Sequence, residues 1–238
     1  MTQKTTVLAA GAASSSVEIM NRTKALLAYG ILAGPIYIGV GILEILLREG
    51  FDLTRHDLSL MSNGSFGWIH IGLMVGTGLL TILGAIGTHR AMHTGRASTW
   101  GPRLIAVYGL GLIGAGLFVA DPANGFPPGT PGGLPNAVSI NSLLHIISGG
   151  FGFLALIAAC FVFARRFAGL RQPVWAAASV ATGVIFFAAF VGIASGSAGD
   201  AATVASVTIA FSIAVVIAWS WISVLFARLR VGVDASAR

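Results

Sequence analysis

The segment Arg48–Trp68, REGFDLTRHDLSLMSNGSFGW, separates two long apolar runs of the sequence. Its first ten residues include two arginines, three carboxylic acids and one histidine, so charge is concentrated there. Ionisable groups that a largely apolar chain keeps close to lipid are default candidates for function. The flanking runs therefore indicate the fold class, and the segment between them supplies the first candidate site residues.

The composition excludes a soluble globular protein. Hydrophobic residues make up 55% of the 238 residues, charged residues only 9%, and the mean hydropathy is +0.87. Soluble domains carry about 25% charged residues. The single cysteine, Cys160, rules out an intrachain disulfide and a thiolate metal cluster.

Six apolar runs have the length that a membrane-spanning helix needs. They are residues 26–47, 67–88, 103–120, 140–164, 174–195 and 201–227. A helix of roughly 17–25 residues crosses the hydrocarbon layer of a bilayer. A backbone exposed to lipid must satisfy its own hydrogen bonds, so each run is expected to be a helix. The sequence predicts an all-α polytopic membrane protein, a six-helix transmembrane bundle over residues 24–228.

Polar tails are expected on both sides of this bundle. Residues 1–23 are expected to form a disordered tail, because their apolar stretch is too short and weak for a signal peptide. Residues 229–238 are expected to form a second tail. Pro102 and Pro173 fall at the expected first turns of the third and fifth helices, where the missing N–H costs nothing. Pro35 predicts a kink inside the first helix.

The distribution of basic residues predicts the orientation. If the N-terminus is cytoplasmic, 12 of the 14 basic residues lie inside, as the positive-inside rule requires, and only Arg48 and Arg55 lie outside. Six of the eight acidic residues lie at or beyond the outer ends. We therefore expect both termini in the cytoplasm. The net charge of +6 then reflects topology and contact with anionic lipid headgroups, and we expect no nucleic-acid partner.

Pairs of small residues at helical spacing predict close helix packing. They are Gly30-xxx-Gly34, Gly72-xxx-Gly76 and Gly111-xxx-Ala115. Such pairs let helix backbones approach each other, which stabilises a bundle in lipid by dispersion. The motifs predict a compact bundle and leave a homo-oligomer open.

The first outer loop has the pattern of a short amphipathic helix. Thr54 and Asp57 have the spacing of a capping box, with Thr54 as the N-cap residue. A helix over residues 55–62 would place Arg55, Ser59 and Ser62 on one face, and would place His56 three residues before Ser59.

The second outer loop, residues 121–138, contains five of the eight prolines. It cannot be a regular helix or strand, but proline stiffens it. Asp121 closes the third span and His145 lies just inside the fourth, both at the outer level. Phe126 is a candidate interfacial anchor.

These motifs resemble the bacterial family called domain of unknown function 998. The resemblance rests on Arg48–Trp68, on Gly101-Pro102, on GLFVADPANGFPPGTP at residues 116–131, and on a histidine early in the following span. It covers nearly the whole chain from the first span onward. It implies a multi-pass protein of the inner (plasma) membrane of high-GC bacteria and no established biochemical activity. Two residues depart from it: His70 stands in place of glutamine, and Asn141 in place of a first histidine.

The candidate site residues map to the outer level of the bundle and come from several segments. They are Arg55, His56, Ser59, Ser62, His70, Asp121 and His145. We expect at least Arg55, Asp121 and His145 to converge on one polar pocket. In the preferred interpretation this pocket binds a lipid headgroup or a small anionic molecule, with Arg55 contacting the anion and the two loops forming a lid.

Three alternatives stay open. In the first, the protein is an outer-leaflet lipid-modifying hydrolase in which His56, Asp121 and His145 bind a divalent metal that activates water. In the second, His70 and His145 ligate a haem in a redox or transport protein. In the third, an Arg–Asp pair only closes the loops over the bundle. The sequence assigns no catalytic residue and no cofactor, and it leaves open whether the protein is an enzyme.

Overall fold

The structure, a computed structural model, describes the backbone of residues 2–235 and the side chains of residues 17–235. The elements in chain order are α1 (Thr2–Leu47), the 3₁₀ helix η1 (Leu58–Ser62), α2 (Gly67–Ala91), α3 (Arg96–Leu117), α4 (Ile140–Gly169), α5 (Pro173–Gly196) and α6 (Ala201–Ala235). No strand occurs within residues 2–235. Six of the helices are long and apolar enough to cross a membrane, counting α1 from Val17. The predicted all-α, six-span fold class is confirmed.

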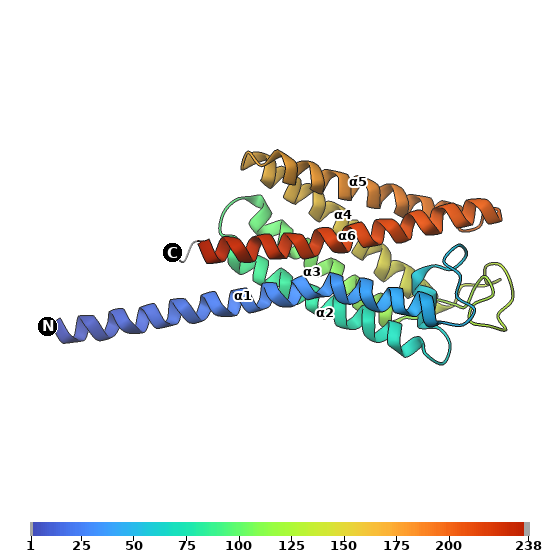
Figure 1. The fold of residues 1–238 in the computed structure, drawn as a ribbon, viewed down its shortest axis with the longest axis horizontal. Coiled ribbons are helices and arrows are strands. Elements are labelled where there is room, and N and C mark those ends of the chain that lie inside the picture. The colour runs from blue at the N-terminus through green and yellow to red at the C-terminus, as the bar shows by residue number, and fades with distance from the viewer. Residues whose placement is uncertain (1, 236–238) are drawn as a thin grey trace.

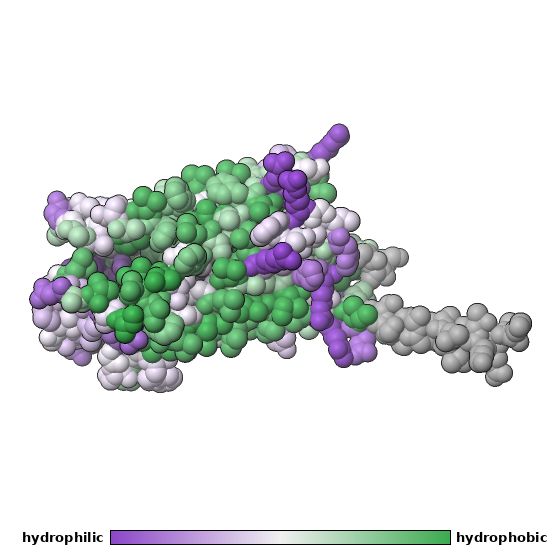
Figure 2. All heavy atoms as spheres, turned by 180° about the vertical axis from the view of Figure 1, so that it is seen from behind, coloured by the Kyte–Doolittle hydropathy of each residue, from purple (hydrophilic) through white to green (hydrophobic). Residues whose placement is uncertain are grey.

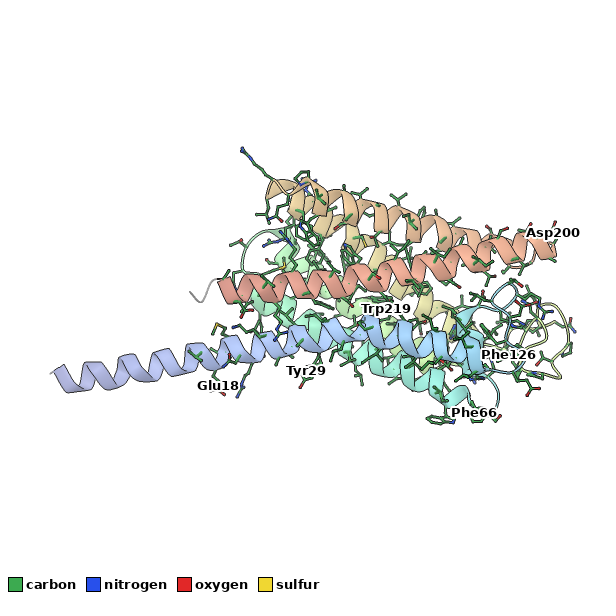
Figure 3. The ribbon with its side chains drawn as sticks, in the orientation of Figure 1. Glu18, Tyr29, Phe66, Phe126, Asp200 and Trp219 are labelled. Atoms are coloured by element: carbon green, nitrogen blue, oxygen red, sulfur yellow. The ribbon has the colours of Figure 1, made fainter. Side chains whose placement is uncertain are left out.

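The six long helices form a closed ring. Each packs on its neighbour in the chain, and α6 packs on α1 (Figure 1). Trp219 of α6 lies in the middle of the bundle (Figure 3) and is 1% exposed. Its ring stacks on Tyr37 of α1 with centroids 4.9 Å apart and lies 5.6 Å from the ring of Tyr108 of α3. Aromatic packing of this kind fixes how the helices meet along the bundle axis.

The two ends of the bundle differ in structure. Both termini lie at one end, the terminus end, as an even number of spans requires (Figure 1). The other end, the loop end, carries loop 1 (residues 48–66) and loop 2 (residues 118–139). Figure 2 shows a broad hydrophobic band between these ends and hydrophilic side chains at both of them. A hydrophobic band between two hydrophilic ends suits a protein that crosses the hydrocarbon layer of a lipid bilayer.

Several helices extend beyond their predicted limits. The chain is helical from Thr2, where we expected a disordered tail over residues 1–23, and α6 continues through residues 229–235. Neither segment contains a proline, and the four alanines of the first segment favour helix there. Met1 and residues 236–238 lie outside the described residues. Helix α3 begins at Arg96 after Gly95, whose φ is +83°, so Pro102 lies inside the helix and not in its first turn.

The remaining prolines behave as their positions predict. Pro173 begins α5. Pro35 lies inside α1, and Figure 1 shows that α1 changes direction part-way along its length. A proline inside a helix removes one backbone hydrogen bond and favours such a bend.

Two of the three small-residue motifs pack as predicted. A Cβ built on Gly30 would lie 2.8 Å from Cα of Gly84 in α2, and one on Gly111 would lie 2.7 Å from Cα of Gly152 in α4. These helices approach backbone to backbone. Within the bundle Gly72 and Gly76 make no such approach, because a Cβ on either would meet no described atom within 4 Å.

Candidate functional site

His56 joins the two loops at the loop end. Its imidazole is fully buried, and Nδ1 accepts a hydrogen bond from the backbone N–H of Asp52 at 2.8 Å. Its Nε2 lies 2.9 Å from the carbonyl oxygen of Asn124 in loop 2, to which it donates. The ring also packs against Phe51 and Phe126, each with centroids 5.4 Å away. Both ring nitrogens are therefore occupied by the loops themselves.

The expected helix over residues 55–62 is replaced by a turn and a short 3₁₀ helix. Asp52 accepts hydrogen bonds from both the backbone N–H and the hydroxyl of Thr54, at 2.9 and 2.6 Å. Aspartate commonly forms such a turn with the residue two positions later. Here the turn engages Thr54, which we expected to be the N-cap residue of a helix. Arg55 is exposed and pairs with Asp52 at 3.0 Å. Helix η1 begins only at Leu58, after Asp57.

Loop 2 is attached to the start of α4 through Asp121. Its Oδ2 accepts a hydrogen bond from the backbone N–H of Ser139 at 2.8 Å, and its own N–H donates to the hydroxyl of Ser142 at 3.3 Å. Hydrogen bonds from Ser139 lower the pKa of the Asp121 carboxyl. Phe126 is 1% exposed and packs under loop 1, so it is not the interfacial anchor that we expected.

A buried arginine holds loop 1 against the end of α1. Arg48 donates to the carbonyl oxygens of Met61 and Asn63, at 2.9 and 2.5 Å. Its guanidinium carbon lies 5.5 Å from the centroid of the Phe126 ring. Asn63 in turn donates to the carbonyl of Ala120 in loop 2 at 3.0 Å. The two loops and α1 thus form one hydrogen-bonded cap over the loop end.

Beneath this cap, Glu44 of α1 lies between Arg48 and His70 of α2. Its Oε1 lies 3.4 Å from Nη1 of Arg48, and its Oε2 lies 2.7 Å from Nδ1 of His70. Glu44 is 5% exposed and His70 is 1% exposed. A carboxylate only accepts hydrogen bonds, so Nδ1 of His70 is the donor to Glu44, and in the neutral form of the imidazole Nε2 then carries a lone pair. That buried Nε2 has no hydrogen-bond partner among the described residues.

His70 lines a pocket of about 220 Å³ between α1, α6, α2 and loop 1. The lining residues are Tyr37, Ile38, Gly41, Ile42, Ile45, Leu53, Leu58, Met61, His70, Ile209, Ser212, Ile213, Val215 and Val216. Glu44 is not one of them. Gly41 is buried, yet a Cβ built on it would meet no described atom within 4 Å. The wall of α1 therefore leaves real space at this point.

The other predicted site residues do not share this pocket. His145 of α4 donates from Nδ1 to the carbonyls of Ala115 and Phe118, at 2.8 and 2.9 Å. Ser59 is half-buried, and Ser62 is buried with a hydroxyl that has no partner among the described residues. Asp121, His145 and Arg55 each bond to a different neighbour. Within residues 17–235, no three His, Cys, Asp or Glu side chains form a group that could hold a metal ion.

Residues 31–228 match the model of the family described as "Protein of unknown function (DUF998)". The chain belongs to this family. The predicted resemblance is confirmed, and the match takes in both loops, Glu44, His70 and the pocket between α1 and α6. No curated protein and no solved structure matches the chain.

Sequence reasoning did not place two residues of this DUF998 chain in the site, Glu44 and Tyr37. From the sequence alone, Glu44 pairs with Arg48, four residues later, at the end of the first span. The sequence signal for Glu44 was its position inside an apolar run, because an acidic side chain in the membrane is energetically costly unless it is paired. Tyr37 carried no such signal, because an aromatic residue in a spanning helix is most often part of the core.

Proposed function

We propose that this protein is a membrane-embedded lipid-binding protein whose site is the pocket between α1 and α6. The apolar part of a lipid occupies the pocket, and His70 Nε2 accepts a hydrogen bond from a hydroxyl or amide group of that lipid. The observation that carries the proposal is the buried, unpartnered Nε2 atom of a histidine that lines an apolar pocket of about 220 Å³.

The pocket wall favours a lipophilic ligand. Most of its lining is aliphatic, from α1, α6 and loop 1. Ile42, Ile213 and Val216 line the pocket and are 50%, 55% and 44% exposed, so its mouth opens on the apolar surface of the bundle. A molecule dissolved in the bilayer reaches such a site laterally, without crossing the cap of loops.

The polar contact favours a hydrogen-bond donor. Glu44 holds the Nδ1 proton of His70, which leaves a lone pair at Nε2. A buried acceptor without a partner costs about 1–3 kcal/mol, which a hydroxyl or N–H from a ligand recovers. One such contact in an apolar pocket orients the ligand and gives specificity.

The charges support an uncharged ligand better than the anionic molecule favoured by the sequence. Arg55, the expected anion-binding residue, is exposed and pairs with Asp52. Arg48 is buried, but Glu44 and two backbone carbonyls already satisfy it. Neither arginine lines the pocket.

The proposal includes the location of the site in the cell. We place the protein in the bacterial plasma membrane, with both termini in the cytoplasm and the loop end outside. The distribution of basic residues supports this orientation. The pocket then opens to the outer leaflet.

Two glycines of α1 supply a matched test. Gly41 lines the pocket, Gly39 does not, and a Cβ on either meets no described atom within 4 Å. Gly41→Leu therefore adds a side chain to the pocket wall with no clash at Cβ, and Gly39→Leu adds the same side chain elsewhere on the helix. We expect native mass spectrometry of protein extracted from its own membranes to show a bound lipid for wild type and Gly39→Leu, and its loss in Gly41→Leu. Equal retention in all three proteins would contradict the proposal.

A second variant tests the polar contact. His70→Asn keeps an N–H near the Nδ1 position for Glu44 and removes Nε2. We expect the fold to be retained and the bound lipid to be lost or weakened about tenfold, the value of one hydrogen bond to a buried group. Unchanged binding in His70→Asn would remove His70 from the site.

The Glu44–His70 pair favours a second candidate function, a lipid-modifying enzyme. A carboxylate that orients a neutral histidine with a free Nε2 is the arrangement of a general base. Incubation of the purified protein with its own bound lipid distinguishes the two functions. A lipid of unchanged mass favours binding alone, whereas a product whose formation requires His70 favours the enzyme.

A further inference from the structure

A second pocket, of about 560 Å³, lies at the terminus end of the bundle. It forms where the last turns of α6 meet the end of α2 and the turn between α4 and α5. The lining residues are Ala91, Met92, Arg166, Phe167, Leu170, Gln172, Trp175, Val224, Ala227, Arg228, Leu229, Val231 and Gly232. This pocket shares no residue with the pocket that His70 lines.

Arg228 is held in a fixed position on one side of this pocket. Its guanidinium lies 4.3 Å from the ring centroid of Trp175 and 5.5 Å from that of Phe167. Its Nη2 donates to Oε1 of Gln172 at 2.7 Å. Stacking uses the face of the guanidinium and this bond uses one of its five N–H donors, so further donors stay free for a ligand.

A second arginine lines the same pocket. Nη1 of Arg166 donates to the carbonyl of Thr94 at 3.1 Å. No carboxylate of the described residues lies within ion-pair distance of Arg166 or Arg228, and the described lining contains no acidic residue. Two half-buried guanidinium groups thus share a pocket whose described lining contains no anion to balance them.

We propose that this pocket binds the phosphate of an anionic phospholipid. A guanidinium binds phosphate oxygens through paired, charge-assisted hydrogen bonds. Leu170 and Val231 line the pocket and are 51% and 67% exposed, so an apolar edge adjoins the arginines where acyl chains would begin. Basic pockets between spanning helices are suited to lipid headgroups of this kind. This site is independent of the function proposed for the His70 pocket.

The test measures lipid binding to the full chain in detergent by native mass spectrometry. The variants carry Gly41→Leu, so that the pocket between α1 and α6 does not contribute. Phosphatidylglycerol is the probe, phosphatidylcholine the uncharged comparison, and glycerol 1-phosphate the soluble competitor. Arg228→Gln and Arg166→Gln remove one pocket cation each. Arg230→Gln is the control, because Arg230 is exposed, lies on the same helix and does not line the pocket.

We expect phosphatidylglycerol to bind the parent and Arg230→Gln equally, and to bind Arg228→Gln and Arg166→Gln about tenfold more weakly. If Arg228→Gln does not fold, Arg166→Gln provides the test. Arg166 makes one solvent-exposed hydrogen bond, to the carbonyl of Thr94, so its loss should not prevent folding. Equal binding of phosphatidylcholine, or an equal loss in Arg230→Gln, would overturn the proposal. Displacement by an equal concentration of glycerol 1-phosphate would show a phosphate site that does not recognise lipid, and would overturn it too.

Discussion

Nδ1 of His70 lies 2.7 Å from Oε2 of Glu44, and both side chains are buried. This contact joins α1 to α2 beneath the cap of loops and leaves Nε2 of His70 without a partner among the described residues. Glu44 is balanced on its other side by Arg48, whose remaining donors hold loop 1. One carboxylate therefore connects the stability of the loop end to the chemistry of the proposed lipid site.

Removing the charge of Glu44 should destabilise the protein strongly. Glu44→Gln leaves Arg48, whose side chain is 9% exposed, without its carboxylate. Loss of one partner of a buried ion pair costs about 3–5 kcal/mol. The control is Glu18→Gln, which breaks an ion pair whose side chains are 63% and 68% exposed and should cost less than about 1 kcal/mol. Denaturant unfolding in mild detergent measures both, and equal effects would contradict the role given to Glu44.

His56 should matter for the two loops and not for the pocket. His56→Ala leaves the Asp52 N–H and the Asn124 carbonyl without their partner, which costs about 1–3 kcal/mol. We expect faster amide hydrogen exchange across residues 121–139 and a lower free energy of unfolding. Arg55→Ala removes only an exposed ion pair and should leave exchange unchanged. Slow exchange retained in His56→Ala would show that other contacts hold the loops together.

The helix contact at Gly34 should not accept a methyl group. A Cβ on Gly34 would clash with Oγ of Ser223 and would lie 2.8 Å from the carbonyl oxygen of Trp219, both on α6. Gly34→Ala should therefore destabilise the bundle by about 1–3 kcal/mol. At Gly72 no described atom lies within 4 Å, so Gly72→Ala should be neutral or slightly stabilising. Thermal unfolding in detergent compares them, and a neutral Gly34→Ala would contradict the α1–α6 packing.

Two aspartates of the loops should respond to pH in opposite directions. Hydrogen bonds from Ser139 lower the pKa of Asp121, so its stabilisation is present above the ordinary carboxyl pKa and is lost as pH falls through the lowered value. Burial raises the pKa of Asp57, so stability falls as pH rises through that raised value.

Thermal unfolding across a pH series checks both signs. Asp121→Asn should lower stability at neutral pH, and its difference from wild type should shrink under acid conditions. Asp57→Asn should raise stability at neutral pH, and its gain should likewise vanish in acid. A pH-independent effect of either substitution would show that hydrogen bonding or packing, and not ionisation, is responsible.

The six spans could be predicted from the sequence because their cause is local. The composition and length of an apolar run decide whether a segment is stable in the hydrocarbon layer, and both can be read directly from the sequence. The helix ends were less accurate. Helix α3 begins at Arg96, seven residues before the start expected at Arg103, because the helix extends past the apolar run into polar residues.

The site could be predicted only in part, because its contacts join distant segments. The sequence indicated His70, but its partner Glu44 lies 26 residues away on another helix, and local spacing tied Glu44 to Arg48 instead. Likewise, we expected Arg55 to lie close to Asp121, whereas it forms an ion pair with Asp52, which is nearer in the sequence. An unpartnered atom such as Nε2 of His70 cannot be recognised before every neighbour is placed.

The most direct test of the lipid site is a structure of the protein in nanodiscs made from its own membrane lipids, at a resolution that shows ordered lipid. We predict an elongated density between α1 and α6, with a polar atom about 3 Å from Nε2 of His70. A pocket closed by side chains, or a lipid whose polar group lies away from His70, would contradict the account.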